Sequence, residues 1–344
     1  KGLEQYQFIT IRSVIMKFVA VILMFVFVNS TSDFPAYGAI TILASLGSYF
    51  FNFINLRNIV ELKFDKKLNL KQHFRPILTF FVMTVATTIY TSLDSVMLGF
   101  MKGDEAVGYY NAAINIKNIL VSLVTSVGAV LLPRLSVFIK EKRETEFRDL
   151  TSKALYFVVF ISIPLSVYFF IYAKQGIYFL SGSAFDNSVI PMQIVMPTLL
   201  LIGLSNLFGI QILVPMDREL VVVHSVSLGA VTNLVLNSIL IPIYGVSGAA
   251  LGTLIAEFLV TIYQAFYLRD FLSKIIYPVD YMKILLSAII AGGVSSLISF
   301  LISINNNFFE LVISFIVFGL MYFITLIVFR EKTFLSIIES FKRN

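Results

Sequence analysis

The chain has 344 residues, of which 58% are hydrophobic and 13% are charged, and its net charge is +6. A mean hydropathy of +0.89 excludes an ordinary soluble domain and is typical of a protein that crosses a membrane many times. The sequence holds no cysteine, which excludes disulfides and thiolate metal sites. The positive charge is spread over short loops and does not indicate a nucleic-acid partner.

Apolar segments of about 20 residues predict an all-α protein with ten membrane-spanning helices. Their ranges are 9–29, 34–56, 76–101, 107–133, 153–173, 190–214, 220–242, 246–268, 283–304 and 308–329. Alternate segments at and between these helices hold 23 of the 26 Lys and Arg residues. The positive-inside rule therefore predicts that both ends of the chain lie in the cytoplasm.

The first two predicted helices carry basic residues near the cytoplasmic side. Arg12 and Lys17 lie in the first helix, where a long basic side chain can reach the headgroups or line a cavity. Residues 57–75 are amphipathic and basic, which predicts an interfacial helix. We expect this segment to link residues 1–56 to the rest of the chain.

The third and fourth predicted helices carry polar stripes. Thr91 and Asp94 belong to a stripe of Thr, Ser and Asp in the third helix. Asn111, Asn115 and Asn118 form a stripe in the fourth. A polar stripe in a membrane helix must face protein or a water-filled cavity. These side chains are therefore candidate cavity residues.

Lys117 lies in the fourth helix, inside the membrane. A charged residue inside a span is a functional-site hypothesis by default. Lys117 is about 100° away from the asparagine stripe, which is the rotation for one helical residue. Two interpretations follow: the ammonium lines the cavity, or it pairs with a neighbouring acid such as Asp94.

The predicted helices 220–242 and 246–268 form a tight hairpin. The spacing of Gly245, Gly248 and Gly252 predicts close contact between the two helices. Asn237 lies on the first helix, and Glu257 lies on the second as another acid inside a span. Glu257 either couples transport to an ion or accepts hydrogen bonds from a neighbouring helix.

The polar residues within the spans suggest a binding cavity for a charged, glycosylated lipid. Cations suit a pyrophosphate headgroup, while Asn and Thr suit sugar hydroxyls. Carboxylates can bind a coupling H⁺ or Na⁺. The candidate substrate-binding residues are Lys17, Thr91, Asn111, Asn115, Lys117, Asn118 and Asn237, and the candidate ion-coupling residues are Asp94 and Glu257.

Catalytic signatures are missing from the sequence. No GxSxG, HExxH, Walker A or CxxC pattern occurs. We therefore expect a transporter without a cofactor or metal centre rather than an enzyme.

Two turns of the chain share a short pattern. Residues 35–38 read PAYG and residues 242–245 read PIYG, and both are expected on the outer side. The match predicts a parallel repeat of six-helix units, with its axis along the membrane normal. The first two helices would then be the fifth and sixth of one unit, and four preceding helices would have no counterpart in the sequence.

Three stretches resemble a known family. LDSVMLGFMKGDEAVGYYNAAINI (93–116), GAVLLPRLS (128–136) and NLVLNSILIPIYGVSGAALGTLIAE (233–257) resemble the second half of Wzx-type polysaccharide flippases. These belong to the multidrug/oligosaccharidyl-lipid/polysaccharide exporter superfamily. The resemblance implies the end of an N-terminal lobe (1–56), a linker (57–75), a complete six-helix lobe (76–272), and two extra helices with an amphipathic tail (273–344).

The resemblance also implies an activity and its partners. The implied activity is flipping of an undecaprenyl-pyrophosphate-linked oligosaccharide across the bacterial cytoplasmic membrane by alternating access. Membrane lipids and a polysaccharide polymerase are the implied neighbours. Two alternatives stay open. A cation-coupled drug antiporter predicts a cavity dominated by carboxylates, which the buried lysine disfavours. A membrane scaffold without transport predicts polar stripes that pack against each other without solvent.

Overall fold

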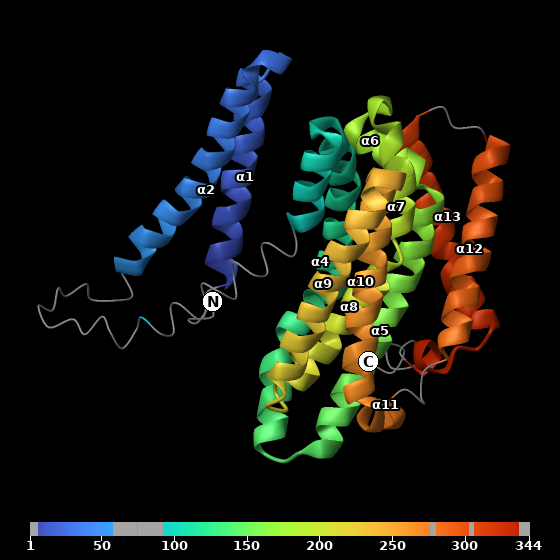
Figure 1. Ribbon diagram of the computed structural model, residues 1–344. Coiled ribbons are helices and arrows are strands. Elements are labelled where there is room, and N and C mark those ends of the chain that lie inside the picture. The colour runs from blue at the N-terminus through green and yellow to red at the C-terminus, as the bar shows by residue number, and fades with distance from the viewer. Residues whose placement is uncertain (1–5, 58–73, 75–91, 276–279, 303–305, 337–344) are drawn as a thin grey trace, which may run out of the picture. The chain divides into compact units, whose positions relative to one another are not determined.

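The computed structural model of the protein describes residues 6–57, 74, 92–275, 280–302 and 306–336 (Figure 1). Every regular element in these ranges is a helix. The chain divides into two compact units, residues 1–80 and 81–344. Nearly all of the predicted linker helix and most of the predicted helix 76–101, including Thr91, lie outside the described residues.

Two helices and a short turn form the first unit. Helix α1 spans Tyr6–Phe27, η1 spans Thr31–Asp33, and α2 spans Phe34–Arg57. In the turn, Asp33 Oδ2 accepts hydrogen bonds from the backbone N–H groups of Asn29 (3.0 Å) and Ser30 (2.9 Å). These donors stabilise the charged carboxylate and lower the pKa of Asp33.

Six helices of the described chain are long and apolar enough to cross a membrane. The number rises to eight if each of two bent pairs is one span. The pairs are Asp104–Ser126 with Leu131–Lys140, bent by 41°, and Ser183–Val195 with Thr198–Leu213, bent by 49°. Helix α1 adds 22 residues at the position of the first predicted span. The chain is therefore a polytopic all-α membrane protein, as predicted.

Helices α4 (Asp104–Lys140) and α5 (Glu144–Ile171) extend beyond the predicted apolar spans. Between them Lys142 adopts a positive φ of 58°. Ion pairs one turn apart sustain the start of α5 at the surface, among them Arg148–Glu144 (3.2 Å) and Lys153–Asp149 (2.7 Å). The predicted start of this helix at residue 153 was therefore nine residues too late.

The predicted helix 190–214 is broken into several pieces. The outer segment before it forms α6 (Ala173–Ser181) and η2 (Ser183–Ser188). The span itself consists of α7 (Val189–Val195), α8 (Thr198–Asn206) and η3 (Leu207–Leu213). Pro197 lies at the bend between α7 and α8, where its ring prevents the regular helical hydrogen bond. The last piece, η3, is a π-helix. This form is rare in proteins overall, but where it occurs it often lies at a functional site.

Helices α9 (Glu219–Tyr244) and α10 (Val246–Tyr267) form the predicted hairpin. A Cβ atom at Gly248 would lie 2.2 Å from the Leu240 carbonyl oxygen, so the two helices touch at this glycine. Gly245 plays a different part from the predicted one, because a Cβ atom there would meet nothing within 4 Å and the residue makes the turn with a φ of +56°. The resemblance between the two PxYG patterns is not structural: residues 35–38 lie inside α2, whereas residues 242–245 end α9.

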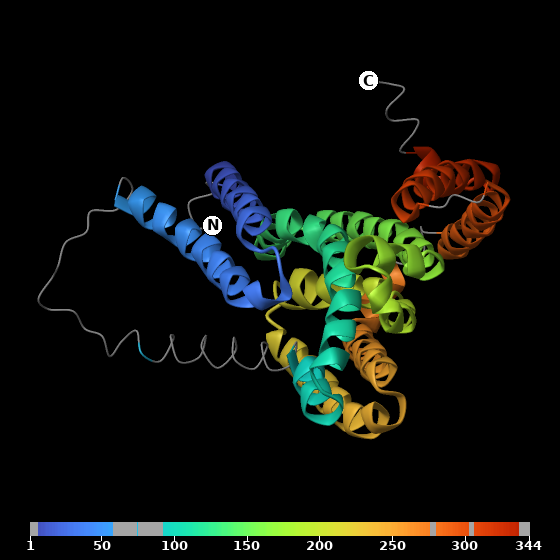
Figure 2. The ribbon, with the colours of Figure 1, turned by 90° about the horizontal axis from the view of Figure 1, so that it is seen from above.

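The C-terminal helices pack together on α5. They are α11 (Arg269–Ile275), α12 (Tyr281–Ile302) and α13 (Asn307–Val328), and Figures 1 and 2 both show α12 and α13 at one side of the second unit. A core of apolar side chains joins them to α5, including Tyr168, Ile284 and Phe318. Helices α12 and α13 therefore lie at the side of the second unit (Figures 1 and 2).

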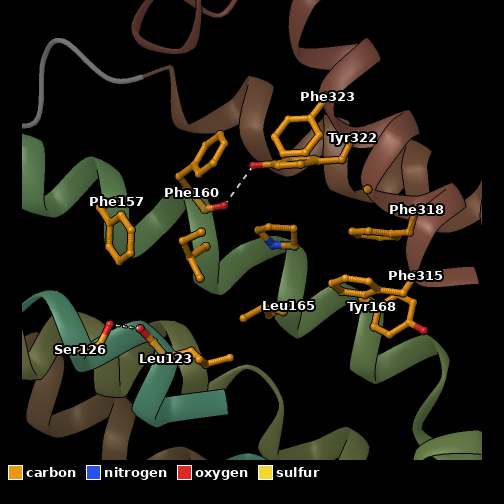
Figure 3. A pocket seen from close by; sticks show the side chains of 13 residues that line it. Leu123, Ser126, Phe157, Phe160, Leu165, Tyr168, Phe315, Phe318, Tyr322 and Phe323 are labelled. Atoms are coloured by element: carbon orange, nitrogen blue, oxygen red, sulfur yellow. Dashed lines mark hydrogen bonds between the residues drawn. The ribbon is translucent and has the colours of Figure 1, made fainter. Parts of the chain in front are cut away.

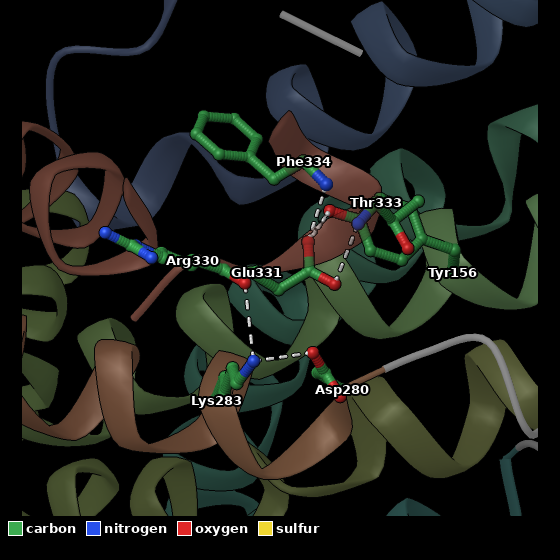
Figure 4. A network of polar contacts seen from close by, with 7 residues as sticks. All are labelled: Tyr156, Asp280, Lys283, Arg330, Glu331, Thr333 and Phe334. Atoms are coloured by element: carbon green, nitrogen blue, oxygen red, sulfur yellow. Dashed lines mark hydrogen bonds and ion pairs between the residues drawn. The ribbon is translucent and has the colours of Figure 1, made fainter. Parts of the chain in front are cut away.

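A buried carboxylate attaches the end of α13 to α5. Glu331 is fully buried and accepts hydrogen bonds from the backbone N–H groups of Thr333 (3.2 Å) and Phe334 (2.6 Å) and from the Tyr156 hydroxyl (3.1 Å) (Figure 4). Nearby, Lys283 bonds to Asp280 at 2.7 Å and to the Arg330 carbonyl oxygen at 3.3 Å. This network caps the short helix that begins after Glu331.

Candidate functional site

Asp94 is the centre of the most connected polar site inside the described membrane helices. It lies on a helix of residues 92–102, and only 7% of its surface is exposed. Its Oδ1 atom accepts hydrogen bonds from the side-chain amides of Asn233 (2.9 Å) and Asn237 (2.6 Å). Its Oδ2 atom accepts from the hydroxyls of Tyr110 (2.5 Å) and Thr253 (2.8 Å). Three helices, α4, α9 and α10, thus converge on one carboxylate.

The local sequence of α9 and α10 builds this convergence. Asn233 and Asn237 are four residues apart on α9, so both point the same way, and Asn237 also donates to Asn233 Oδ1 at 3.1 Å. Gly252 of α10 leaves the space that Asn237 occupies, because a Cβ atom there would lie 2.2 Å from Asn237 Oδ1. Thr253 follows directly and faces Asp94. A glycine and a threonine in succession therefore bring α10 against the asparagines.

The donors around Asp94 stabilise its negative charge without cancelling it. All four are neutral side chains, so the carboxylate has no cationic hydrogen-bond donor among them. Asn237 Oδ1 is buried and has no hydrogen-bond partner. Carboxylate, amide and hydroxyl oxygens are the ligands that hard cations prefer. No cluster of three or more His, Cys, Asp or Glu side chains that could hold a metal ion occurs among the described residues.

Lys117 is buried on α4, with 9% of its surface exposed. The carboxylates of Glu257 of α10 and of Asp94 both attract its charge. Glu257 is half-buried. The Asp94 carboxylate itself is surrounded by neutral donors, so Lys117 acts on it at longer range. Two interpretations were open for Lys117, and the charges of both acids act on its ammonium.

The asparagine stripe lies on another face of α4. Asn111, Asn115 and Asn118 are all exposed in the second unit, and Ser95 donates to Asn111 Oδ1 at 3.1 Å. Exposed amides on a spanning helix require protein or water beside them, because lipid cannot satisfy their hydrogen bonds. Lys17 is exposed on α1, in the first unit. The structure therefore brings Asp94 and Asn237 together, with Lys117 and Glu257 near them, and separates the stripe from this group.

Tyr110 has a role that the sequence pattern did not reveal, and Gly252, whose spacing predicted close contact between helices, also leaves room for a hydrogen-bond donor to Asp94. Tyr110 precedes Lys117 by seven residues, which places both on one face of α4. That spacing was the available signal for Tyr110. For Gly252 the signal was its place directly before Thr253, in a helix rich in small residues.

A groove of about 490 Å³ lies apart from the Asp94 site, among residues of α4, α5 and α13 (Figure 3). Its walls are almost entirely apolar. The Tyr168 hydroxyl donates to the Leu311 carbonyl oxygen at 2.7 Å, and the Tyr322 hydroxyl donates to the Phe160 carbonyl oxygen at 3.2 Å. The polar atoms of both tyrosines are thus used by the protein. The groove suits a hydrocarbon chain and offers no site for a charged group.

Two protein families match the chain. The family described as polysaccharide biosynthesis protein matches residues 1–139, and the MatE family matches residues 80–239. A protein of Escherichia coli (strain K12) named as an O-antigen transporter is 28% identical over 275 residues, which are 78% of this chain and 65% of that protein. Its counterpart in Shigella dysenteriae is 24% identical over 77% of this chain and 66% of its own length. The chain thus spans just under two thirds of these relatives.

Two further proteins are similar. A protein of Haloferax volcanii named as a glycan biosynthesis flippase is 22% identical over 75% of this chain and 55% of its own length. The solved structure of the lipid II flippase MurJ, in an inward closed conformation, shares the fold. Its TM-score is 0.75 at 21% identity, and the match covers 95% of this chain and 68% of that one. The chain is therefore similar to polysaccharide biosynthesis proteins over residues 1–139 and to MatE proteins over residues 80–239, and it shares its fold with the MurJ structure.

Proposed function

We propose that this chain is part of a secondary transporter that flips an undecaprenyl-pyrophosphate-linked oligosaccharide from the inner to the outer leaflet, for surface polysaccharide synthesis. The observation that carries the proposal is the buried Asp94 carboxylate, held by four neutral donors on helices that also present an exposed asparagine stripe. The relatives named as transporters and flippases of glycans support the class of substrate.

Each group of polar residues has a proposed part in transport. Asn111, Asn115 and Asn118 would donate and accept hydrogen bonds with sugar hydroxyls, since amides do both. The ammonium groups of Lys17 and Lys117 would attract the pyrophosphate. Asp94 would bind the coupling H⁺ or Na⁺, with Glu257 and Thr91 also in the transport pathway. Alternating access would then expose this cavity to each side of the membrane in turn.

The proposed location is the bacterial cytoplasmic membrane, with both ends of the chain in the cytoplasm. The basic connections between helices would lie near anionic lipid headgroups, which attract Lys and Arg. A polysaccharide polymerase that uses the flipped lipid is a proposed neighbour.

A cation-coupled drug antiporter is the second candidate. The match of residues 80–239 to the MatE family favours it, because that family covers most of the Asp94 site. Expression of the full-length protein in a drug-sensitive host distinguishes the two. Resistance to cationic dyes favours the antiporter, whereas restored surface glycan without resistance favours the flippase.

Complementation tests the flippase directly. Full-length protein carrying Asp94→Asn is expressed in a host that lacks its own flippase for the same glycan. Surface polysaccharide should be about tenfold or more lower than with the unchanged protein, because a rise of ~1.4 kcal/mol in the activation free energy of transport slows it tenfold. Lys117→Ala should also lower it. The control is Asp149→Asn, which removes an exposed carboxylate paired with Lys153. Normal surface polysaccharide in both Asp94→Asn and Lys117→Ala cells, at matched protein levels, would refute the assigned site.

A further inference from the structure

Helices α4 and α10 begin at the same end of the bundle. The Lys102 ammonium, just before α4, donates to the Pro242 carbonyl oxygen, just before α10, at 3.0 Å. Both helices therefore run in the same direction from that end. Residues with larger numbers on either helix lie farther from it.

This shared direction places Lys117 and Glu257 on the same side of the Asp94 pocket. Tyr110 of α4 and Thr253 of α10 mark the level of the pocket, and their hydroxyl oxygens lie 3.1 Å apart. Lys117 follows Tyr110 by about two helical turns on the same face. Glu257 follows Thr253 by about one turn on the same face. The basic and acidic side chains thus both lie beyond the pocket, along the line where α4 and α10 face each other. We call this line the seam.

The lysine side chain leans toward the pocket. Side chains of an α-helix tilt toward its N-terminus, and the N-terminus of α4 lies on the Tyr110 side. The ammonium of Lys117 is thereby directed back toward Asp94 and across to Glu257, which agrees with the two acids being its electrostatic partners. Lys117 is also buried, so solvent screens these interactions only weakly.

We propose that Lys117 is a tethered cation that competes with the coupling cation for the Asp94 and Glu257 carboxylates, and that an anionic headgroup relieves this competition by drawing the ammonium away. The proposal rests on the proposed transport function. It explains how one seam can link the binding of the coupling cation to the binding of the anionic headgroup. Each of these two ligands favours the binding of the other, because such coupling is reciprocal. Lys117 is a positioning residue in this scheme, since its charge sets the affinity of a site that other residues form.

The test measures cation binding to the purified full-length protein. Its melting temperature is followed during a Na⁺ titration at constant ionic strength and, without Na⁺, during a pH titration. A unit charge about 10 Å away at an effective dielectric of ~20 changes the affinity for a cation by roughly tenfold. Lys117→Gln should therefore tighten cation binding by about tenfold. Lys117→Arg keeps the charge and should match the unchanged protein, and Lys117→Met replaces the Gln variant if that one does not fold.

Three controls separate the outcomes. Lys102→Gln removes a cation outside the seam and should leave cation affinity unchanged. Asp94→Asn should abolish cation binding, both as a single variant and in the double variant with Lys117→Gln. Inorganic pyrophosphate should tighten cation binding in the unchanged protein and have no effect in Lys117→Gln.

Equal cation affinity with and without the lysine charge would overturn the proposal, and so would the absence of any cation effect in Lys117→Gln. A pyrophosphate effect that persists in Lys117→Gln would overturn the link to the headgroup. The flippase itself is judged separately, by complementation. If the protein restores surface polysaccharide and Lys117→Gln has unchanged cation affinity, the proposed role of Lys117 is rejected while the flippase function stands.

Discussion

At the residue scale, two buried carboxylates of the second unit show different designs. Glu331 accepts hydrogen bonds from two backbone N–H groups, which are fixed once the helix forms. Among the described residues, Asp94 accepts from four side chains, whose torsions can change without unfolding a helix. A carboxylate with rearranging donors suits a site that binds and releases a cation, whereas one with backbone donors suits a permanent connection.

Gly252 offers a direct test of the Asp94 site. Replacement by Ala places a methyl group 2.2 Å from Asn237 Oδ1, so Asn237 must move and loses its bond to Asp94. We expect Gly252→Ala to lower the free energy of unfolding by about 1–3 kcal/mol and to reduce surface polysaccharide in the complementation assay.

The matched control for Gly252→Ala is Gly293→Ala in α12, where nothing lies within 4 Å of the added carbon. Ala favours helix more than Gly, so this variant should be neutral or stabilised by up to ~1 kcal/mol. Thermal unfolding of both purified proteins provides the comparison. Equal melting temperatures would show that Asn237 is not held by the space at Gly252.

At the element scale, the ends of the α9–α10 hairpin and of the span made by α7, α8 and η3 were both predicted to within a few residues, but the internal breaks of that span were not predicted. The glycine spacing and the apolar runs of the hairpin are local signals, and they indicated both helices within three residues of their ends. The π-helical turn at Leu207–Leu213 depends instead on its neighbours. Gln211 of that turn points at Gly128 of α4, where a Cβ atom would lie 1.8 Å from Gln211 Nε2. No local pattern specifies such a contact.

Gly248 holds the two helices of the hairpin together. An added Cβ atom would lie 2.2 Å from the Leu240 carbonyl oxygen, and a backbone atom inside a helix cannot turn aside as a side chain can. We expect Gly248→Ala to destabilise the protein by about 1–3 kcal/mol. Thermal unfolding beside Gly319→Ala, where the added carbon meets nothing within 4 Å, provides the measurement. A melting temperature equal to that of the control would contradict the close packing of α9 on α10.

At the scale of the whole molecule, the orientation of the helices remains a prediction. The absence of cysteine makes it simple to test, since any introduced thiol is unique. Lys102 precedes α4 and Lys142 follows it, and both are exposed. If α4 crosses the membrane once, these two positions lie on opposite sides.

A maleimide that cannot cross membranes should therefore label Lys102→Cys in intact cells. Lys142→Cys should be labelled only after the membrane is permeabilised. The positive-inside rule predicts this result from the basic residues of the connection after α4. The reverse pattern would place the ends of the chain outside, and labelling of both positions in intact cells would show that α4 does not span.

The sequence alone determined that the protein is a polytopic bundle of helices, because length and hydropathy are local properties and a bilayer allows few other structures. It also indicated Asp94, Asn237, Lys117 and Glu257 as unusual. Only the tertiary structure decided which polar groups meet. The partners of Asp94 are between 16 and 159 residues away in the chain, and helical periodicity gives the face of a residue but not the helix that packs against it. Packing therefore brought polar residues of four helices into one site around Asp94 and left the asparagine stripe of α4 outside it.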